Sequence, residues 1–300
     1  MHWETRPVDT IAGARKVAER TVIKVTLLSP EAMATAVDRY FAGAAQARSW
    51  QVETAVDWAG ADAGRLTDGQ RSAVEFVTVI EDHLPGYFAL YTEHFPVDDS
   101  VDADEYQHNR VLYHFTVRWA AEEDTHARAL ARYQAASGLR DERSVRQALV
   151  EPGQARFELP FGHPVQFFAY ALVQEKATQI YYQQLRAVSG DPVLGELLTR
   201  LSRDEARHFT FMADVVSSYL RHHGDQVLDP IREVIAGFRM PLADTLRGYW
   251  RWALKIADTA RYDHTDAYEH LIKVLNRAVD TPSDRLGELV TFVDSCRSIS

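Results

Sequence analysis

Apolar residues recur every three or four positions along nearly the whole chain, which is the period of an amphipathic helix. No segment alternates apolar and polar residues with the Val, Ile and Thr enrichment that is typical of strands between turns. The pattern therefore predicts an all-α protein. The predicted helices cover residues 8–24, 30–47, 68–95, 105–136, 141–150, 163–189, 191–222, 226–236, 241–259, 263–279 and 282–295.

Four of the predicted helices are long enough to form a helical bundle: 68–95, 105–136, 163–189 and 191–222. A short connection joins the last two and makes them antiparallel neighbours, whereas residues 137–162 form a longer crossover before them. One long crossover is typical of ferritin-like bundles. We expect a single ferritin-like domain over residues 1–300, with the core helices at about 68–222 and flanking helices at 8–47 and 226–295.

Composition and charge exclude several classes of protein. Hydrophobic residues make up 46% of the chain and charged residues 25%, which excludes disordered, collagen-like and low-complexity proteins. The formal net charge of −10 argues against nucleic acid or an anionic membrane as the main partner. No apolar run approaches the length of a membrane span, so we expect no membrane insertion. The single cysteine, Cys296, and a start without secretory features lead us to expect a cytoplasmic protein.

Two of the long helices carry a Glu-x-x-His motif, at Glu123 and His126 and at Glu205 and His208. Residues three positions apart share a helix face, so the carboxylate and the imidazole of each motif can bind one metal ion together. Both motifs lie on apolar faces, where an unpaired carboxylate is costly. The alternative is that these acids pair with arginines such as Arg128 and Arg207.

A third Glu-x-x-His motif, Glu105 and His108, is expected to be structural. It precedes Glu123 by about five helical turns, roughly 27 Å, and so cannot join the same cluster.

The remaining two long helices each place one glutamate, Glu81 or Glu175, on an apolar stripe. Alone, each glutamate is compatible with a core or interface residue whose carboxylate has hydrogen-bond or ion-pair partners. Together, the four glutamates balance two divalent cations, and two neutral histidines complete the set. Oxygen and nitrogen ligands without thiolate favour two iron ions, with manganese as a possible substitute.

Four segments, in order along the chain, resemble the soluble acyl-[acyl-carrier-protein] desaturases, which are ferritin-like di-iron carboxylate proteins: 80–87, 119–126, 174–178 and 204–208. The resemblance spans about residues 30–260 and is that of a divergent member of bacterial type. It implies that the iron ligands are Glu81, Glu123, His126, Glu175, Glu205 and His208.

The same resemblance implies roles for residues around the metals. Thr178 matches a catalytic threonine beside the oxygen site, Trp50 and Trp119 match an electron path, and Asp204 matches an acid next to the ligands. Trp119 is equally compatible with core packing, and Thr178 with bonding a backbone carbonyl. Pro85 removes the helical partner of the Glu81 carbonyl, which predicts a kink there.

The resemblance implies an O₂-dependent oxidoreductase of fatty acid metabolism that introduces a double bond into an acyl chain on acyl carrier protein. It further implies a homodimer and an electron donor such as ferredoxin. The candidate residues for the acyl slot are Phe88, Tyr113, Phe161, Phe167 and Tyr182. A basic patch for the acidic carrier is expected from Arg15, Lys16, Arg20, Lys24, Arg39 and Arg48.

Departures from the family pattern leave two alternatives open. Asp124 and Thr125 stand where the family has Asn-Arg, Ala127 replaces a glycine, and Phe209 replaces an acid. The first alternative is therefore a di-iron oxygenase that hydroxylates or N-oxygenates a carrier-bound intermediate. The second is a non-catalytic metal-binding or structural bundle.

Overall fold

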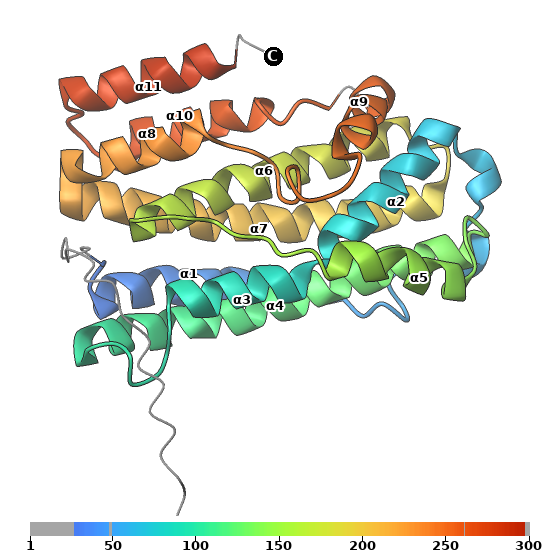
Figure 1. The fold of residues 1–300 in the computed structure, drawn as a ribbon, viewed down its shortest axis with the longest axis horizontal. Helices are drawn as coiled ribbons and strands as arrows, with labels where there is room; N and C mark the ends of the chain where they lie inside the picture. The colour runs from blue at the N-terminus through green and yellow to red at the C-terminus, as the bar shows by residue number, and fades with distance from the viewer. Residues whose placement is uncertain (1–26, 48–49, 261, 298–300) are drawn as a thin grey trace, which may run out of the picture.

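The computed structural model describes residues 27–47, 50–260 and 262–297, and within these ranges every regular element is a helix (Figure 1). The predicted helix 8–24 lies outside the described residues. The α-helices are α1 Pro30–Gln46, α2 Asp68–Asp82, α3 Leu84–His94, α4 Ala103–Ala136, α5 Glu142–Gly153, α6 Pro164–Val188, α7 Pro192–His223, α8 Leu228–Ala236, α9 Tyr249–Ala260, α10 Asp266–Ala278 and α11 Asp284–Cys296. Short 3₁₀ turns lie at η1 Trp58–Gly60, η2 Ala63–Arg65 and η3 Gly224–Val227.

Helices α6 and α7 pack together along their length at the centre of the molecule, as predicted for antiparallel neighbours (Figure 1). Helices α1, α3 and α4 lie on one side of this pair, and α8, α10 and α11 lie on the other. The reversal between α6 and α7 is sharp because Asp191 caps the N-terminus of α7 and Pro192 follows it. The all-helical, ferritin-like architecture predicted from the periodicity is confirmed.

The first predicted core helix, 68–95, is two helices rather than one. Helix α2 ends at Asp82, α3 begins at Leu84, and His83 lies between them. The predicted cause is present: Pro85 has no N–H for the carbonyl of Glu81, so the helical ladder is interrupted. Glu81 therefore lies in the last turn of α2, next to a break that frees the chain to change direction.

Two further helix boundaries differ from the sequence prediction. Residues 241–248 form turns and a bend, so the helix predicted for 241–259 begins only at Tyr249. The reason is backbone conformation: φ is positive at both Leu242 (62°) and Gly248 (74°), which a right-handed helix does not allow. Helix α5 continues to Gly153 and includes Pro152 in its last turn, where the missing N–H removes one helical hydrogen bond.

Two apolar clusters occupy the interior, one toward each end of the long helices. Along α4, buried Phe115 and Trp119 precede the polar motif, and buried Leu130 and Tyr133 follow it. The core helices thus hold a short polar centre between two dry apolar layers. Among the described residues, no helix is long and apolar enough to cross a membrane.

Candidate metal centre

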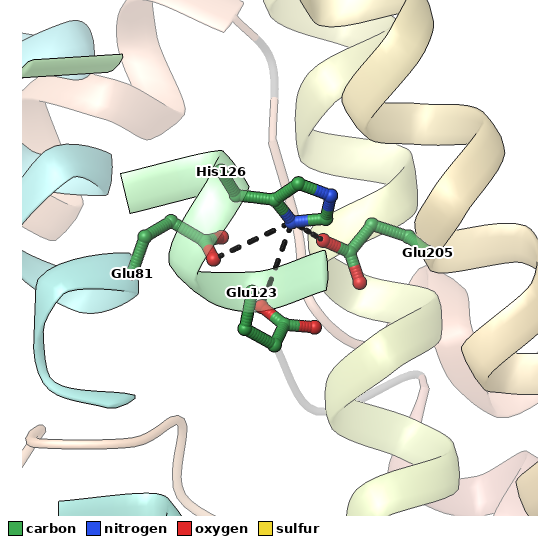
Figure 2. A group of neighbouring side chains, drawn as sticks. All are labelled: Glu81, Glu123, His126 and Glu205. Carbon is green, nitrogen blue, oxygen red and sulfur yellow. Dashed lines mark ion pairs between the residues drawn. The ribbon is translucent and has the colours of Figure 1, made fainter. Parts of the chain in front are cut away.

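The structure brings the six predicted ligand residues together in the middle of the bundle. They form two overlapping groups, in each of which the candidate ligand atoms lie within 4.8 Å of one another. One group is Glu81, Glu123, His126 and Glu205, shown in Figure 2, and the other is Glu123, Glu175, Glu205 and His208. Four helices supply them: α2, α4, α6 and α7. All six side chains are buried.

Two glutamates, Glu123 and Glu205, belong to both groups. Nδ1 of His126 lies 3.5 Å from Glu123 Oε2 and 3.2 Å from Glu205 Oε1. Nδ1 of His208 lies 2.9 Å from the other oxygen of Glu123 and 3.4 Å from the other oxygen of Glu205. Each of these carboxylates therefore offers one oxygen to each half of the cluster, which is the arrangement of a bridging ligand.

The other two glutamates each serve one half of the cluster. Glu81 Oε2 lies 3.7 Å from His126 Nδ1, and Glu175 Oε2 lies 3.5 Å from His208 Nδ1. Tyr182 donates a hydrogen bond to Glu81 Oε1. Tyr182 was expected in the acyl slot, and its fully buried hydroxyl instead binds this carboxylate.

Several atoms at this centre have no hydrogen-bond partner among the described residues. They include Nδ1 of His126 and of His208, and both carboxylate oxygens of Glu205. Buried polar atoms are rarely left without partners, because each costs about 1–3 kcal/mol. The unpartnered atoms are oxygen and imidazole nitrogen that converge on a shared space, so the donor set fits two metal cations.

The outer nitrogen of each imidazole faces an acid. Nε2 of His126 lies 3.2 Å from Asp204 Oδ2, and Nε2 of His208 lies 2.9 Å from Glu122 Oε2. When Nε2 carries the proton and donates it to these acids, the Nδ1 lone pair of each imidazole points at the centre. Metal binding through Nδ1 requires this tautomer.

Glu122 was not assigned a role from the sequence. A signal for it exists, because Glu122 precedes Glu123 just as Asp204 precedes Glu205. Tyr40 also donates to Glu122 Oε2 at 2.7 Å, and Arg118 Nε donates to its other oxygen at 2.8 Å.

The arginines considered as alternative partners do not pair with the six central residues. Arg128 pairs with exposed Glu53 at 3.0 Å and Asp124 at 3.9 Å. Arg207 Nη2 lies 2.6 Å from Asp204 and 3.4 Å from Glu122, and so contacts only the outer acids. In the described part of the chain, arginine pairing therefore leaves the inner carboxylates uncompensated.

Both predicted tryptophans contact the cluster. Trp50 donates from Nε1 to Asp204 Oδ2 at 2.8 Å, and its ring is parallel to that of His126, with centroids 6.3 Å apart. Trp119 donates from Nε1 to Glu175 Oε1 at 3.2 Å and also packs against Tyr91. Trp119 thus combines core packing with a contact to a candidate ligand.

Thr178 lies one turn beyond Glu175 on α6 and is buried. Its hydroxyl accepts a hydrogen bond from Gln174 Nε2 at 3.4 Å. It also lines a cavity of about 30 Å³ together with Ile80 and Pro241. Thr178 is therefore near the cluster without belonging to either ligand group.

The third Glu-x-x-His motif is separate from the cluster, as expected. His108 is buried, its Nδ1 lies 2.9 Å from Asn109 Oδ1, and its ring packs beside Phe95. Glu105 lies in the first turn of α4, where its N–H bonds to the capping residue Asp102.

Without bound metal, several buried groups of the centre have raised pKa values and therefore hold protons more strongly than they would in water. Burial, reinforced by the charge of Glu123, raises the pKa of Glu81 to about 7, and burial with the same charge raises the pKa of Glu205. Burial opposes ionisation of Glu123, but the two imidazoles outweigh it and hold the pKa of Glu123 well below its usual range. Burial also opposes charge on His126 and His208, yet the surrounding oxygens raise the pKa of both.

A narrow cavity of about 40 Å³ lies against Glu81, Glu123 and Glu175. Phe157, Leu159 and Tyr170 also line a larger outer cavity of about 540 Å³, formed by residues 156–161 and the 237–245 turns. The small cavity at the carboxylates and the wide outer cavity thus share part of their walls.

The predicted slot residues divide between these spaces. Phe167 lines the inner cavity and Phe161 the outer one. Phe88 and Tyr113 are not among the described residues that line either cavity, and Tyr113 instead lies beside the Arg110 guanidinium.

Most of the expected basic patch lies outside the described residues: Arg15, Lys16, Arg20, Lys24 and Arg48. Arg39 is described, and its guanidinium pairs with Asp214 at 2.9 Å.

Comparison with known proteins places the chain among desaturases. A family model described as fatty acid desaturase matches residues 45–280. Among curated relatives, the acyl-[acyl-carrier-protein] desaturase DesA2 of Mycobacterium tuberculosis is 26% identical over 53% of this chain and 54% of its own length. Stearoyl-[acyl-carrier-protein] 9-desaturase 6 of Arabidopsis thaliana, a chloroplastic protein, is 29% identical over 72% of this chain and 52% of its own. The chain spans about half of the length of these relatives.

A solved structure has the same fold. The X-ray structure of the acyl-ACP desaturase DesA2 from Mycobacterium tuberculosis H37Rv superposes with a TM-score of 0.59 at 18% identity, covering 87% of this chain and 98% of the other. At that identity the likeness shows the fold.

Proposed function

The chain belongs to the fatty acid desaturase family, and from this premise we propose that it is a di-iron, O₂-dependent desaturase acting on an acyl chain bound to acyl carrier protein. The observation that carries the proposal is the double contact of Glu123 and Glu205, each of which faces both imidazoles. Bound iron would supply the power to activate O₂ and remove hydrogen from unactivated carbons, which no side-chain acid or base provides.

The protein residues then have distinct tasks. Glu123 and Glu205 would be shared by the two metal sites, and Glu81 with His126 and Glu175 with His208 would supply the remaining ligands of each site. The outer acids fix the imidazoles by accepting hydrogen bonds from Nε2, and the apolar layers on both sides exclude water.

The inner cavity orients the substrate. It lies directly against three of the carboxylates, so two neighbouring carbons of an acyl chain can be held beside the metals. Desaturation removes two hydrogens from these carbons, and O₂ takes up both together with two further electrons and two protons to form two waters. The electrons must come from an outside donor such as a ferredoxin, and Trp50, which contacts both Asp204 and His126, gives them a route.

Oxygen insertion is the second candidate, and two of the four departures that motivate it lie away from the site. Asp124 is exposed and pairs with Arg128, and the Thr125 hydroxyl bonds the carbonyl of Ala121. These two departures from the family pattern therefore leave the metal surroundings unchanged, which favours desaturation.

The proposal is tested by loading the protein with ferrous iron and supplying reduced ferredoxin, O₂ and acyl chains on carrier protein. We expect products that have lost two hydrogens, detected by mass spectrometry. Gain of one oxygen would show the oxygenase instead. Iron binding without any product from a broad panel of acyl chains would support the non-catalytic bundle. Absence of iron binding would exclude the di-iron desaturase, the di-iron oxygenase and the iron-binding bundle alike.

A further inference from the structure

Helix α9 presents large apolar side chains to solvent. Trp250 is 61% exposed and Leu254 is 63% exposed, and their spacing of four residues puts them on one face. The opposite face of α9 attaches it to α2, where the rings of Tyr249 and Trp252 pack on Phe76. Trp250 and Leu254 thus do not contribute to the packing of α9 on the bundle.

Cations flank this exposed apolar pair in an otherwise acidic protein. Residues 247–255 contain three cations, Arg247, Arg251 and Lys255, and no acid, whereas the whole chain has a formal net charge of −10. Arg251 lies over the ring of Trp250 at 5.2 Å, and Lys255 donates to Ser72 Oγ at 2.5 Å. No carboxylate among the described residues forms an ion pair with any of the three, so their charge is available to a partner.

This face also adjoins the route toward the metals. Arg247 lines a cavity of about 590 Å³, and Thr245 lines both that cavity and the outer cavity of about 540 Å³. The outer cavity shares Phe157 and Tyr170 with the cavity at the carboxylate cluster. A partner seated on α9 would therefore lie beside the wide end of the path to the reacting centre.

We propose that Arg247, Trp250, Arg251, Leu254 and Lys255, here called the α9 face, form the docking surface for an acidic acyl carrier protein. The carrier's acids complement the three cations, and the apolar pair gives the contact a core that excludes water. The inference rests on the proposed function and adds to it the place where the substrate is delivered. It differs from the patch expected on the N-terminal arginines.

The test measures the affinity of the iron-loaded protein for palmitoyl-loaded acyl carrier protein. The charge-reversal variant combines Arg247→Glu, Arg251→Glu and Lys255→Glu. We expect it to bind at least about 10-fold more weakly than wild type, and we expect the salt dependence of binding to shrink. A second variant, Trp250→Ser with Leu254→Ser, should also weaken binding without changing the salt dependence.

The matched control reverses three exposed cations elsewhere, Arg110, Lys273 and Arg277, on helices α4 and α10. It has the same change in net charge and should keep the affinity of wild type. Because all the substituted side chains are exposed and none belongs to the central cluster, iron content should stay unchanged in every variant.

The outcomes separate this inference from the proposed function. If wild type binds the carrier and the α9 variants bind equally well, the docking surface is wrong while the function stands. If wild type binds no acyl carrier protein at all, both fail. Loss of a dimer in the α9 variants by light scattering would assign the face to a second copy of the chain. Binding to vesicles containing phosphatidylglycerol, but not to the carrier, would assign it to a membrane surface.

Discussion

Glu122 and Asp204 show how single residues prepare the centre, because each holds one imidazole by its outer nitrogen. Asp204 follows from the family resemblance and Glu122 does not, although each acid binds an imidazole on another helix and only the packed bundle brings these partners together. Spacing along one helix predicts contacts within it, as for Glu123 and His126, but gives no information about partners across the bundle.

The contact between Glu122 and His208 leads to the first prediction. Glu122→Ala removes the acceptor for His208 Nε2, so the imidazole loses its fixed orientation and ferrous affinity should fall about 10–100-fold. A competitive chelator titration measures this. Asp124→Ala, which removes an exposed acid two positions away, should leave the affinity unchanged. Equal affinities in the two variants would contradict a positioning role for Glu122.

Trp50 gives a second prediction at this scale. Trp50→Phe keeps an aromatic ring beside His126 but removes the donor to Asp204, so we expect slower reduction of bound iron by ferredoxin with normal iron content. Stopped-flow absorbance measures the rate. Trp58→Phe, which removes a hydrogen bond to the Val52 carbonyl instead, is the control. If Trp50→Phe is reduced as fast as wild type, electrons take another route.

Among the helices, the break between α2 and α3 was predicted in position but not in extent. Pro85 indicated a kink, and the structure has a full interruption at His83. The start of α9 was missed because residues 241–248 have helical periodicity but contain buried Leu242 with positive φ, which a right-handed helix does not allow. Periodicity predicts which residues would share one face of a helix, but the backbone conformation decides whether the helix forms.

Gly86 in α3 supplies a prediction about stability. A Cβ there would lie 2.4 Å from His83 Nε2, and the buried His83 ring is packed against Tyr87 and Phe157. We expect Gly86→Ala to lower the free energy of unfolding by about 1–3 kcal/mol, although alanine normally favours a helix.

Gly195 in α7 is the matched control for Gly86. A Cβ at Gly195 meets nothing within 4 Å, so Gly195→Ala should stabilise by about 0.5–1 kcal/mol. Urea unfolding followed by circular dichroism measures both. If Gly86→Ala stabilises as much as Gly195→Ala, His83 does not hold a fixed position.

For the molecule as a whole, the sequence predicted the architecture and the six central residues, since both follow from helical period and from carboxylates on apolar faces. It did not predict the outer cavity or the α9 face. Those depend on how the 156–161 segment and the 237–245 turns fold over the bundle. The first segment carries no periodic signal, and the second was predicted in part as a helix.

The buried charges predict how stability of the metal-free protein depends on pH. The pKa of Glu81 is about 7 in the folded protein against an ordinary 4.5, so the folded state holds more protons between these values and stability falls as pH rises through them. The raised pKa of His126 and of His208 extends the fall above their ordinary 6.5. We expect the melting temperature of metal-free protein to drop from about pH 6 to about pH 9.

Metal should reverse this trend, because bound cations replace the protons and metal affinity rises as the ligands deprotonate. Differential scanning calorimetry with and without ferrous iron measures both curves. Glu81→Gln should flatten the metal-free curve, whereas Glu75→Gln, also on α2 but paired with Arg140, should not. A metal-free melting temperature that rises over this range would contradict the assigned charges.

The central claim is that two cations bind between Glu123 and Glu205 in the dry interior of the bundle. Anomalous diffraction at the iron edge, from crystals grown anaerobically with ferrous salt, tests it most directly. The account predicts two peaks, one among Glu81, Glu123, His126 and Glu205 and the other among Glu123, Glu175, Glu205 and His208. An interior without anomalous peaks, or peaks held only by surface residues, would contradict it.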